Sequence, residues 1–304
     1  MFWKKKKVLV THNGGFHSDD IFACATIILL LEKRGEVYKI VRTREESKIQ
    51  KADFVFDVGG VYDPMKNRFD HHQKGGAGVR ENNVPMASFG LVWRAFGEEI
   101  CGDKIVAEEI DRKFAQPIDA NDNGMDVFKS NIPEVSPVTF QDIAGAFYPD
   151  PSSSDEEYDE SFLKLVNLAK EILERSILKI QKQQEVNSYM KSLYESGPEK
   201  RFIVVDRKYS RHEVTVGAIY LEELLYVIYP SKPGDEWNIV ATRKNIESME
   251  SKKPFPGEWA GLSGFDLQKV SKVMTAKFCH NGRFLCVAEK LEDAKELATL
   301  AIKG

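Results

Sequence analysis

Short apolar runs alternate with amphipathic stretches along the first sixty residues. Runs rich in β-branched residues, as in buried strands, occupy 7–11, 37–43 and 53–58, and helical patterns occupy 20–34 and 45–51. The order strand, helix, strand, helix, strand predicts a parallel sheet with right-handed crossovers. Ligands of such sheets bind beyond the carboxyl ends of the strands.

Apolar residues then recur at helical spacing in three longer stretches, 86–100, 103–114 and 161–195, while 125–148 has no clear period. The last helix is too long for one small core, so we expect it to join two domains. A stretch rich in proline, serine and acidic residues precedes it. The predicted organisation is a first domain at 1–160, a connecting helix at 161–196 and a second domain at 197–304.

The pattern after Gly197-Pro198 is that of a small mixed domain. Strands are expected at 201–206 and 237–243, a hairpin at 277–288, helices at 266–274 and 291–302, and helix or strand at 213–229. The predicted fold class is therefore α/β: a mostly parallel sheet with flanking helices, plus a smaller α+β C-terminal domain.

Four metal-ligating side chains follow the first predicted strand within nine residues: His12, His17, Asp19 and Asp20. Further candidates are Asp57, at the end of the third strand, the run Asp70-His71-His72, and the pair Asp119 and Asp122. Each group alone is also compatible with ordinary turn or loop chemistry.

The predicted fold favours metal binding over ordinary turn chemistry, because the ends of the first and third strands share one edge of a parallel sheet. Several imidazoles and carboxylates gathered there would be costly unless they coordinated cations. Mixed nitrogen and oxygen ligands without cysteine favour manganese or a similar divalent ion. The number of candidates exceeds the needs of one ion, so a pair of ions is plausible.

Composition narrows the classes of partner and compartment. A net charge of −4 argues against a general electrostatic grip on duplex nucleic acid. A local basic path remains open, with candidates Arg42, Arg44, Arg68, Lys74 and Arg80. The longest apolar run, 21–31, is about half the ~20 residues that a bilayer requires, so no membrane association is expected. Four cysteines without CxxC spacing favour a reduced, cytoplasmic setting.

Four ordered segments resemble the motifs of the melanocyte-proliferating-gene exonuclease family, a branch of the DHH phosphoesterase superfamily. They are residues 11–20, 57–60, 69–73 and 119–124, and two C-terminal segments, 256–262 and 278–284, also look like that family. The resemblance implies a DHH domain carrying two Mn²⁺ or Mg²⁺ ions and a smaller substrate-binding domain.

The resemblance also implies roles for single residues. The implied metal ligands are His12 and His17 on one ion, Asp19 on the other, Asp57 as the bridge, and His71 with Asp122 completing the second site. The implied catalytic residues are Asp57, His71 and His72, with His72 holding a substrate phosphate or orienting the nucleophile. Asp70 would fix an imidazole, Asp20 would cap the helix, and Asp119 is an alternative ligand.

Two departures from the superfamily pattern concern the ligands and the grip on substrate. His17 stands where the superfamily usually has aspartate, so either Asp19 or Asp20 could ligate. The paired-glycine phosphate turn of the second domain is missing, which leaves His280 and Arg283 as candidate phosphate contacts.

Three functions are compatible with these features. The first is a 3′–5′ exonuclease acting on single-stranded RNA or short oligonucleotides. A homodimer is compatible with the sequence. The second is a hydrolase of a small phosphate compound such as pyrophosphate or a cyclic dinucleotide. The third is a nucleotide-binding metalloprotein without activity, which would need a closed coordination shell.

Overall fold

The chain forms two compact units, Met1–Ile180 and Gln181–Gly304. The computed structural model describes residues 5–231 and 236–304. Each unit contains a five-stranded sheet. The first sheet is mostly parallel and flanked by helices, and the second is mixed, so the predicted fold class is confirmed.

The sheet of the first unit orders its strands β2-β1-β3-β5-β4. They are β1 (Lys7–Thr11), β2 (Tyr38–Arg42), β3 (Phe54–Phe56), β4 (Tyr62–Asp63) and β5 (Arg68–Phe69). All neighbours pair in parallel except β4 and β5, which are antiparallel. The carboxyl ends of β1, β3 and β5 therefore lie at one edge of the sheet.

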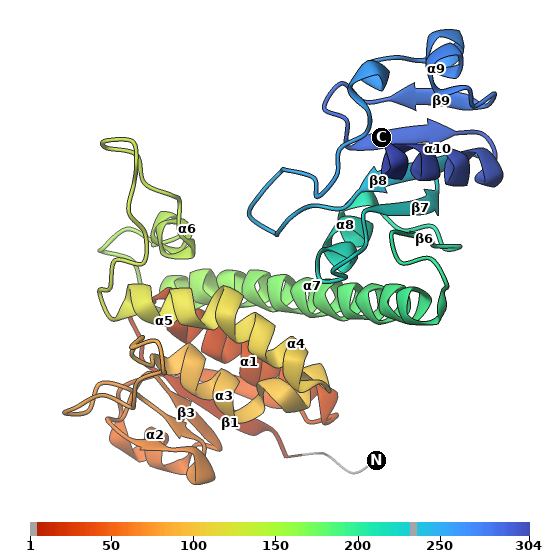
Figure 1. Cartoon of the computed structure of the whole chain (residues 1–304). Helices are drawn as coiled ribbons and strands as arrows, with labels where there is room; N and C mark the ends of the chain where they lie inside the picture. Colours follow the sequence, from red (N-terminus) through yellow and green to blue (C-terminus); the bar gives the residue numbers. More distant parts are fainter. Residues whose placement is uncertain (1–4, 232–235) are drawn as a thin grey trace. The chain divides into compact units, whose positions relative to one another are not determined.

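Helices cover both faces of this sheet (Figure 1). The helices between residues 18 and 146 are α1 (Ser18–Lys33), α2 (Glu46–Lys51), η1 (Pro64–Lys66), α3 (Ser88–Cys101), α4 (Lys104–Ile110), η2 (Asp111–Ala115), α5 (Gln116–Asp122) and α6 (Phe140–Ala146). Leu9 and Phe54 belong to the large core that α1 and α3 complete. Val10 and Val55 belong to a smaller core with Ile49 of α2. This alternation is the period of two of a strand buried on both faces.

Two stretches are more helical than the sequence indicates. Beyond α4 the chain continues through a π-helical turn, η2, directly into α5, whose first turn contains Pro117. The stretch 125–148, predicted to be irregular, contains α6. A capping box of Thr139 and Asp142 begins that helix.

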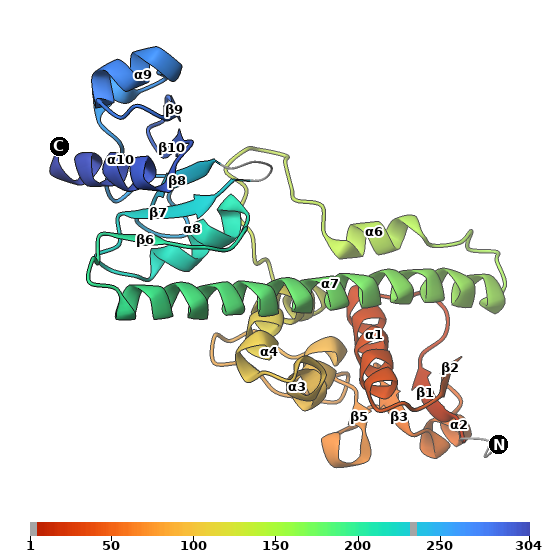
Figure 2. The same ribbon diagram turned by 90° about the vertical axis from the view of Figure 1, so that its right-hand side faces the viewer.

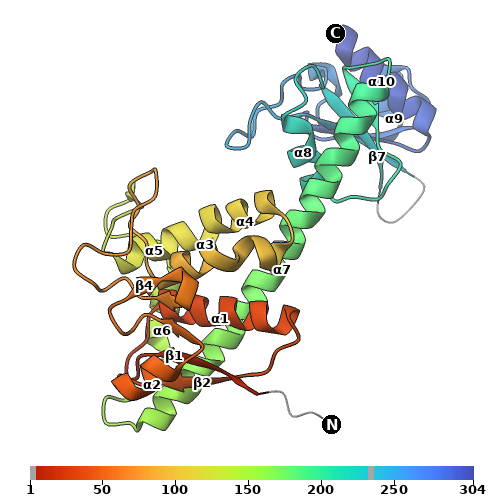
Figure 3. The same cartoon turned by 90° about the horizontal axis from the view of Figure 1, so that it is seen from below.

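The long helix α7 (Asp155–Ser196) contributes to both units. Phe162 and Leu165 lie in the core of the first unit, and Val186 and Met190 lie in a core of the second. The division between the units falls inside this helix, which runs unbroken (Figure 3). It begins earlier than predicted because three acidic residues starting at Asp155 suit the positive end of a helix.

The second unit orders its strands β6-β7-β8-β10-β9, with β6 and β7 parallel and the other pairs antiparallel. Its elements are β6 (Phe202–Val204), α8 (Arg211–Ile219), β7 (Tyr226–Pro230), β8 (Trp237–Ala241), η3 (Gly257–Trp259), α9 (Gly264–Ser271), β9 (Ala276–Cys279), β10 (Leu285–Ala288) and α10 (Leu291–Lys303). The ambiguous stretch 213–229 divides between α8 and β7. Figure 2 shows β7 and β8 between α10 and α8. Within 5–231 and 236–304, no helix is both long and apolar enough to cross a membrane.

Candidate metal centre

The candidate ligands gather where three parallel strands end. His12 follows β1, Asp57 follows β3, and Asp70, His71 and His72 follow β5. Because β1 pairs with β3 and β3 with β5, these side chains meet at the carboxyl edge of the sheet, where the sequence predicts the site.

The start of α1 adds three more polar side chains. His17 is the N-cap residue, and the Asp20 carboxylate Oδ1 accepts a hydrogen bond from the His17 backbone N–H at 3.0 Å. Asp19 is fully buried and its Oδ2 accepts from the Ser88 backbone N–H at 3.2 Å, at the start of α3. The predicted cap by Asp20 is therefore present, but only one of its two oxygens is used for it.

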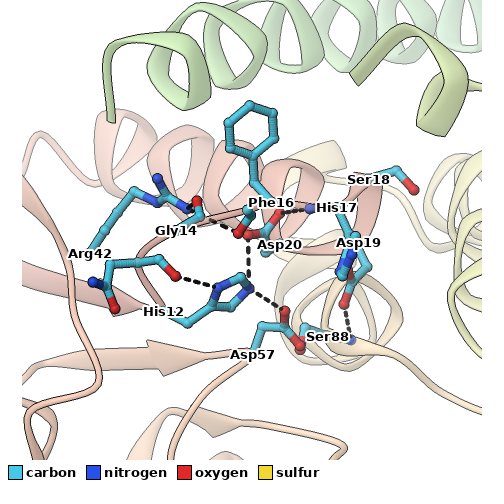
Figure 4. A network of polar contacts seen from close by, with 12 residues as sticks. His12, Gly14, Phe16, His17, Ser18, Asp19, Asp20, Arg42, Asp57 and Ser88 are labelled. Carbon is cyan, nitrogen blue, oxygen red and sulfur yellow. Dashed lines mark hydrogen bonds and ion pairs between the residues drawn. The ribbon is translucent and has the colours of Figure 1, made fainter. Parts of the chain in front are cut away.

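Asp57 lies between two imidazoles, and Figure 4 shows the side that faces His12. Its Oδ2 is 3.1 Å from His12 Nε2, and its Oδ1 is 3.2 Å from His71 Nε2. Ser88 Oγ donates a further hydrogen bond to Oδ1 at 3.1 Å. The backbone φ of Asp57 is +54°, a left-handed conformation that is uncommon outside glycine and concentrates at functional sites.

Three sets of potential ligands result, each with its ligand atoms within 4.8 Å of one another. They are His12, Asp20 and Asp57; Asp57, His71 and His72; and His17, Asp19 and Asp122. His71 Nε2 also lies 3.3 Å from Asp122 Oδ2, at the end of α5. The structure thus brings together all six residues that the family resemblance implies as ligands.

The grouping differs from the partition that the resemblance implies. His17 is grouped with Asp19 and Asp122 and not with His12, because it lies at the start of α1, on the side of α5. The free oxygen of Asp20, Oδ2, lies 3.3 Å from His12 Nε2 instead. Asp20 is therefore as well placed to ligate as Asp19.

Asp70 fixes the orientation of the exposed His72 imidazole. Its Oδ1 lies 2.8 Å from His72 Nδ1 and accepts from the His72 backbone N–H at 3.1 Å, while its Oδ2 accepts from the Gly60 N–H at 2.5 Å. Burial opposes ionisation of Asp70, but these donors outweigh it and lower its pKa. His72 is 63% exposed in its side chain, so its Nε2 edge remains open to a ligand.

Asp119 does not join the cluster. Its Oδ2 pairs with Arg80 Nη1 at 2.7 Å, and its Oδ1 accepts from the Gly90 N–H at 2.9 Å. Its expected role as an alternative ligand has no support in this geometry. Arg80 and Arg42 are also buried and paired, which removes both from the basic path that the sequence suggests.

The charge balance of the cluster fits a cation. Burial alone would lower the pKa of His12, but Asp20 and Asp57 outweigh it and raise that pKa to about 10. Burial and the neighbouring carboxylates raise the pKa of Asp19. Asp19 Oδ1 and His71 Nε2 are buried without a well-aligned hydrogen bond. Buried, unsatisfied nitrogen and carboxylate atoms that face one another are the donor set of a divalent metal ion.

Two features of the centre have no signal in the sequence. Ser88 contacts both Asp19 and Asp57 from a helix start with no recognisable motif. Arg42 contacts the loop that follows β1, but nothing in the sequence distinguishes it from the other basic residues.

The two candidate phosphate contacts lie in the second unit, at the turn between β9 and β10. His280 Nδ1 accepts a hydrogen bond from the Gly282 N–H at 2.9 Å, and the His280 ring lies 4.3 Å from the Phe284 ring. Arg283 has a φ of +54°. Their part in substrate binding stays a prediction.

A family model and curated relatives that match this chain carry the same family name. The family model MYG1_exonuc, described as Uncharacterised protein family UPF0160, matches residues 8–302. The human protein named MYG1 exonuclease is 28% identical over 321 residues, covering 95% of this chain and 84% of the relative. The MYG1 protein of Chlamydia pneumoniae is 28% identical over 303 residues and covers 96% of each.

Among solved structures, RecJ of Thermus thermophilus in complex with Mn²⁺ aligns with 98% of this chain at 13% identity. The chain spans 52% of that structure, and the TM-score is 0.28, which is too low to establish a shared fold.

Proposed function

The chain belongs to the MYG1_exonuc family, Uncharacterised protein family UPF0160, and on that premise we propose that it is a metal-dependent exonuclease. The proposed substrate is single-stranded RNA or a short oligonucleotide, shortened from its 3′ end. The observation that carries the proposal is the buried cluster around Asp57, where imidazoles and carboxylates meet without enough hydrogen-bond donors to satisfy them.

Two divalent ions, Mn²⁺ or Mg²⁺, fit the arrangement of the Asp57 carboxylate. One of its oxygens faces His12 and the other faces His71, so Asp57 would be the ligand common to both ions. The remaining donors divide between the two sides: Asp20 lies beside His12, and Asp19 and Asp122 lie beside His71. When bound, such a pair stabilises the attacking and leaving oxygens of a displacement at phosphorus.

The protein's own contribution would then be orientation. Asp70 holds the His72 ring by Nδ1, so that Nε2 faces outward, where a substrate phosphate or an attacking water could accept or donate a hydrogen bond. Ser88 holds the Oδ1 side of Asp57. These contacts leave the carboxylate and the imidazole little freedom to turn, which is what a reaction of fixed geometry requires.

The proposal is tested with RNA and DNA oligonucleotides labelled at the 5′ end and incubated with the protein and manganese. We expect a ladder of RNA products shortened one nucleotide at a time from the 3′ end. Pyrophosphate and a cyclic dinucleotide are run in parallel. Turnover of these compounds alone would indicate a small-phosphate hydrolase, and manganese binding without any turnover would indicate a binding protein; either result refutes the exonuclease.

Replacing His72 by alanine should separate catalysis from metal binding. We expect His72→Ala to lower kcat by about 100-fold or more, as for the loss of a group that handles a proton or a phosphate. The manganese affinity, measured by calorimetry, should stay close to that of the wild type. His212→Ala, which removes an exposed histidine of α8, is the control and should behave as wild type. Loss of manganese binding in His72→Ala would instead make His72 a ligand.

A further inference from the structure

We propose that Arg42 is a positioning residue of the metal centre. Its guanidinium holds the glycine turn between His12 and α1, and thereby keeps His12 and Asp20 in the same ligand set. The inference rests on the proposed function only in requiring that the cluster bind a divalent ion. No step of the hydrolysis itself is assigned to Arg42.

Arg42 lies directly beside the end of β1. It is the last residue of β2 and pairs with Thr11 in the parallel ladder. The next backbone N–H, of Thr43, donates to the Thr11 carbonyl at 2.7 Å. The backbone of Arg42 is therefore fixed against the residue that immediately precedes His12.

From that position the side chain reaches the turn. Its Nη2 donates to the Gly14 carbonyl at 2.7 Å and to the Gly15 carbonyl at 3.3 Å (Figure 4). Gly14 has a φ of +81°, a conformation that an L side chain rarely adopts. A glycine turn of this kind has no side chains that could fix the orientation of its carbonyls. The Arg42 guanidinium fixes that orientation by donating to two consecutive carbonyls.

The surroundings of Arg42 make this position well defined. The side chain is only 1% exposed, and its Nη1 pairs with Asp159 of α7 at 3.0 Å. The guanidinium carbon lies 5.6 Å from the Phe16 ring centre and 4.6 Å from the Phe162 ring centre. A buried guanidinium requires such compensation, and a planar one can stack on rings while it donates in its own plane.

The restraint matters because the turn connects two members of one ligand set. His12 precedes the turn and Asp20 follows it, yet His12 Nε2 and Asp20 Oδ2 lie 3.3 Å apart. If the turn relaxes, His12 and the start of α1 can move relative to each other. Groups that only orient ligands typically change metal affinity by about 10- to 100-fold when removed.

The test is manganese binding by isothermal titration calorimetry, without substrate. Arg42→Met should weaken binding by about 10- to 100-fold. Arg42→Lys keeps the charge but not the planar fork, so it should lie between Arg42→Met and the wild type. Arg44→Met, which removes an exposed arginine two residues away, should bind as wild type. Asp159→Asn removes the ion pair and keeps both carbonyl contacts, and it should also stay near wild type.

Each outcome decides the proposal. Wild-type affinity in a folded Arg42→Met variant overturns it, and so does an equal loss in Asp159→Asn, because the carbonyl contacts would then not carry the effect. If Arg42→Met does not fold by circular dichroism, Arg42→Lys decides: weakened binding supports the role and wild-type binding refutes it. A wild type that binds manganese but cleaves nothing refutes only the exonuclease function, whereas a wild type that binds no manganese refutes both.

Discussion

Replacing Asp57 by asparagine is expected to abolish manganese-dependent hydrolysis. The substitution keeps the size of the side chain, and asparagine tolerates the left-handed backbone that this position requires, so the fold should persist. What is lost is the charge that faces His12 on one oxygen and His71 on the other. No other side chain in the three ligand sets occupies that shared position.

Metal binding should be lost together with activity. Burial opposes the ionised form of Asp57, but the imidazoles of His12 and His71 outweigh it and lower its pKa, so the carboxylate is charged at any working pH. In the wild type, manganese at about 100 times its Kd should add about 2.7 kcal/mol to the free energy of unfolding. A neutral amide could not replace the carboxylate that would be the ligand common to both ions, so Asp57→Asn should show almost none of this stabilisation.

Thermal unfolding with and without manganese measures the effect, and the oligonucleotide assay measures activity. Asp103→Asn is the matched control, since Asp103 caps α4 outside the three ligand sets and asparagine caps a helix equally well. Full activity in a correctly folded Asp57→Asn protein would rule out the proposed centre.

Replacing Arg80 by methionine is expected to destabilise the first unit by about 3–5 kcal/mol, the usual result of removing one partner of a buried ion pair. Arg80 donates to Asp119 at 2.7 Å and to Asp111 at 2.9 Å. A Cβ atom on Gly90 would lie only 1.8 Å from Asp119 Oδ2, which shows how closely α3 approaches this pair. The carboxylate left behind has no room for solvation.

The loss of stability in Arg80→Met should grow as the pH rises. Burial raises the pKa of Asp119 to about 7 even though Arg80 acts to lower it. Without Arg80 that pKa rises further, so the folded variant retains a proton above pH 7 that the folded wild type releases. Since the unfolded chain has lost this proton well below pH 7, the stability of the variant keeps falling as the pH rises, while the wild type levels off.

Urea unfolding at pH 6 and pH 8 tests this prediction. The difference between wild type and Arg80→Met should be larger at pH 8. Adding Asp119→Asn to Arg80→Met should recover part of the loss, because a buried amide needs no counter-ion. Equal losses at both pH values, with no recovery in the double variant, would show that Asp119 carries no uncompensated charge.

The sequence predicts the metal centre wherever the residues follow strand ends. His12 and Asp57 could be placed together because parallel strands align their carboxyl ends, a rule that needs no side-chain detail. His71 follows β5, a two-residue strand that the sequence analysis does not predict, so this rule alone could not place it. Family resemblance adds Asp122. The helix cap by Asp20 could be predicted, but the approach of its second oxygen to His12 could not, because it depends on the path of the turn between them. The pairing of Asp119 could not be predicted either, because its partner Arg80 comes from a distant loop.

Arg80 illustrates the reason. It reaches Asp119 from a glycine-rich loop 39 positions away in the sequence, and nothing local distinguishes it from a solvated arginine. The sequence also gives no indication of the π-helical turn η2, although this turn links α4 to the helix that ends at Asp122. Periodicity identifies elements, but the pairing of buried charges is decided by tertiary packing.

The shared helix α7 determines how this protein can be dissected into fragments. A fragment ending before Asp155 would lack Phe162 and Leu165 and leave the first core open to water. A fragment starting after Ser196 would lack Val186 and Met190 and leave the second unit incomplete. Fragments meant to fold separately must therefore each carry their own part of the helix, with the cut near Ile180.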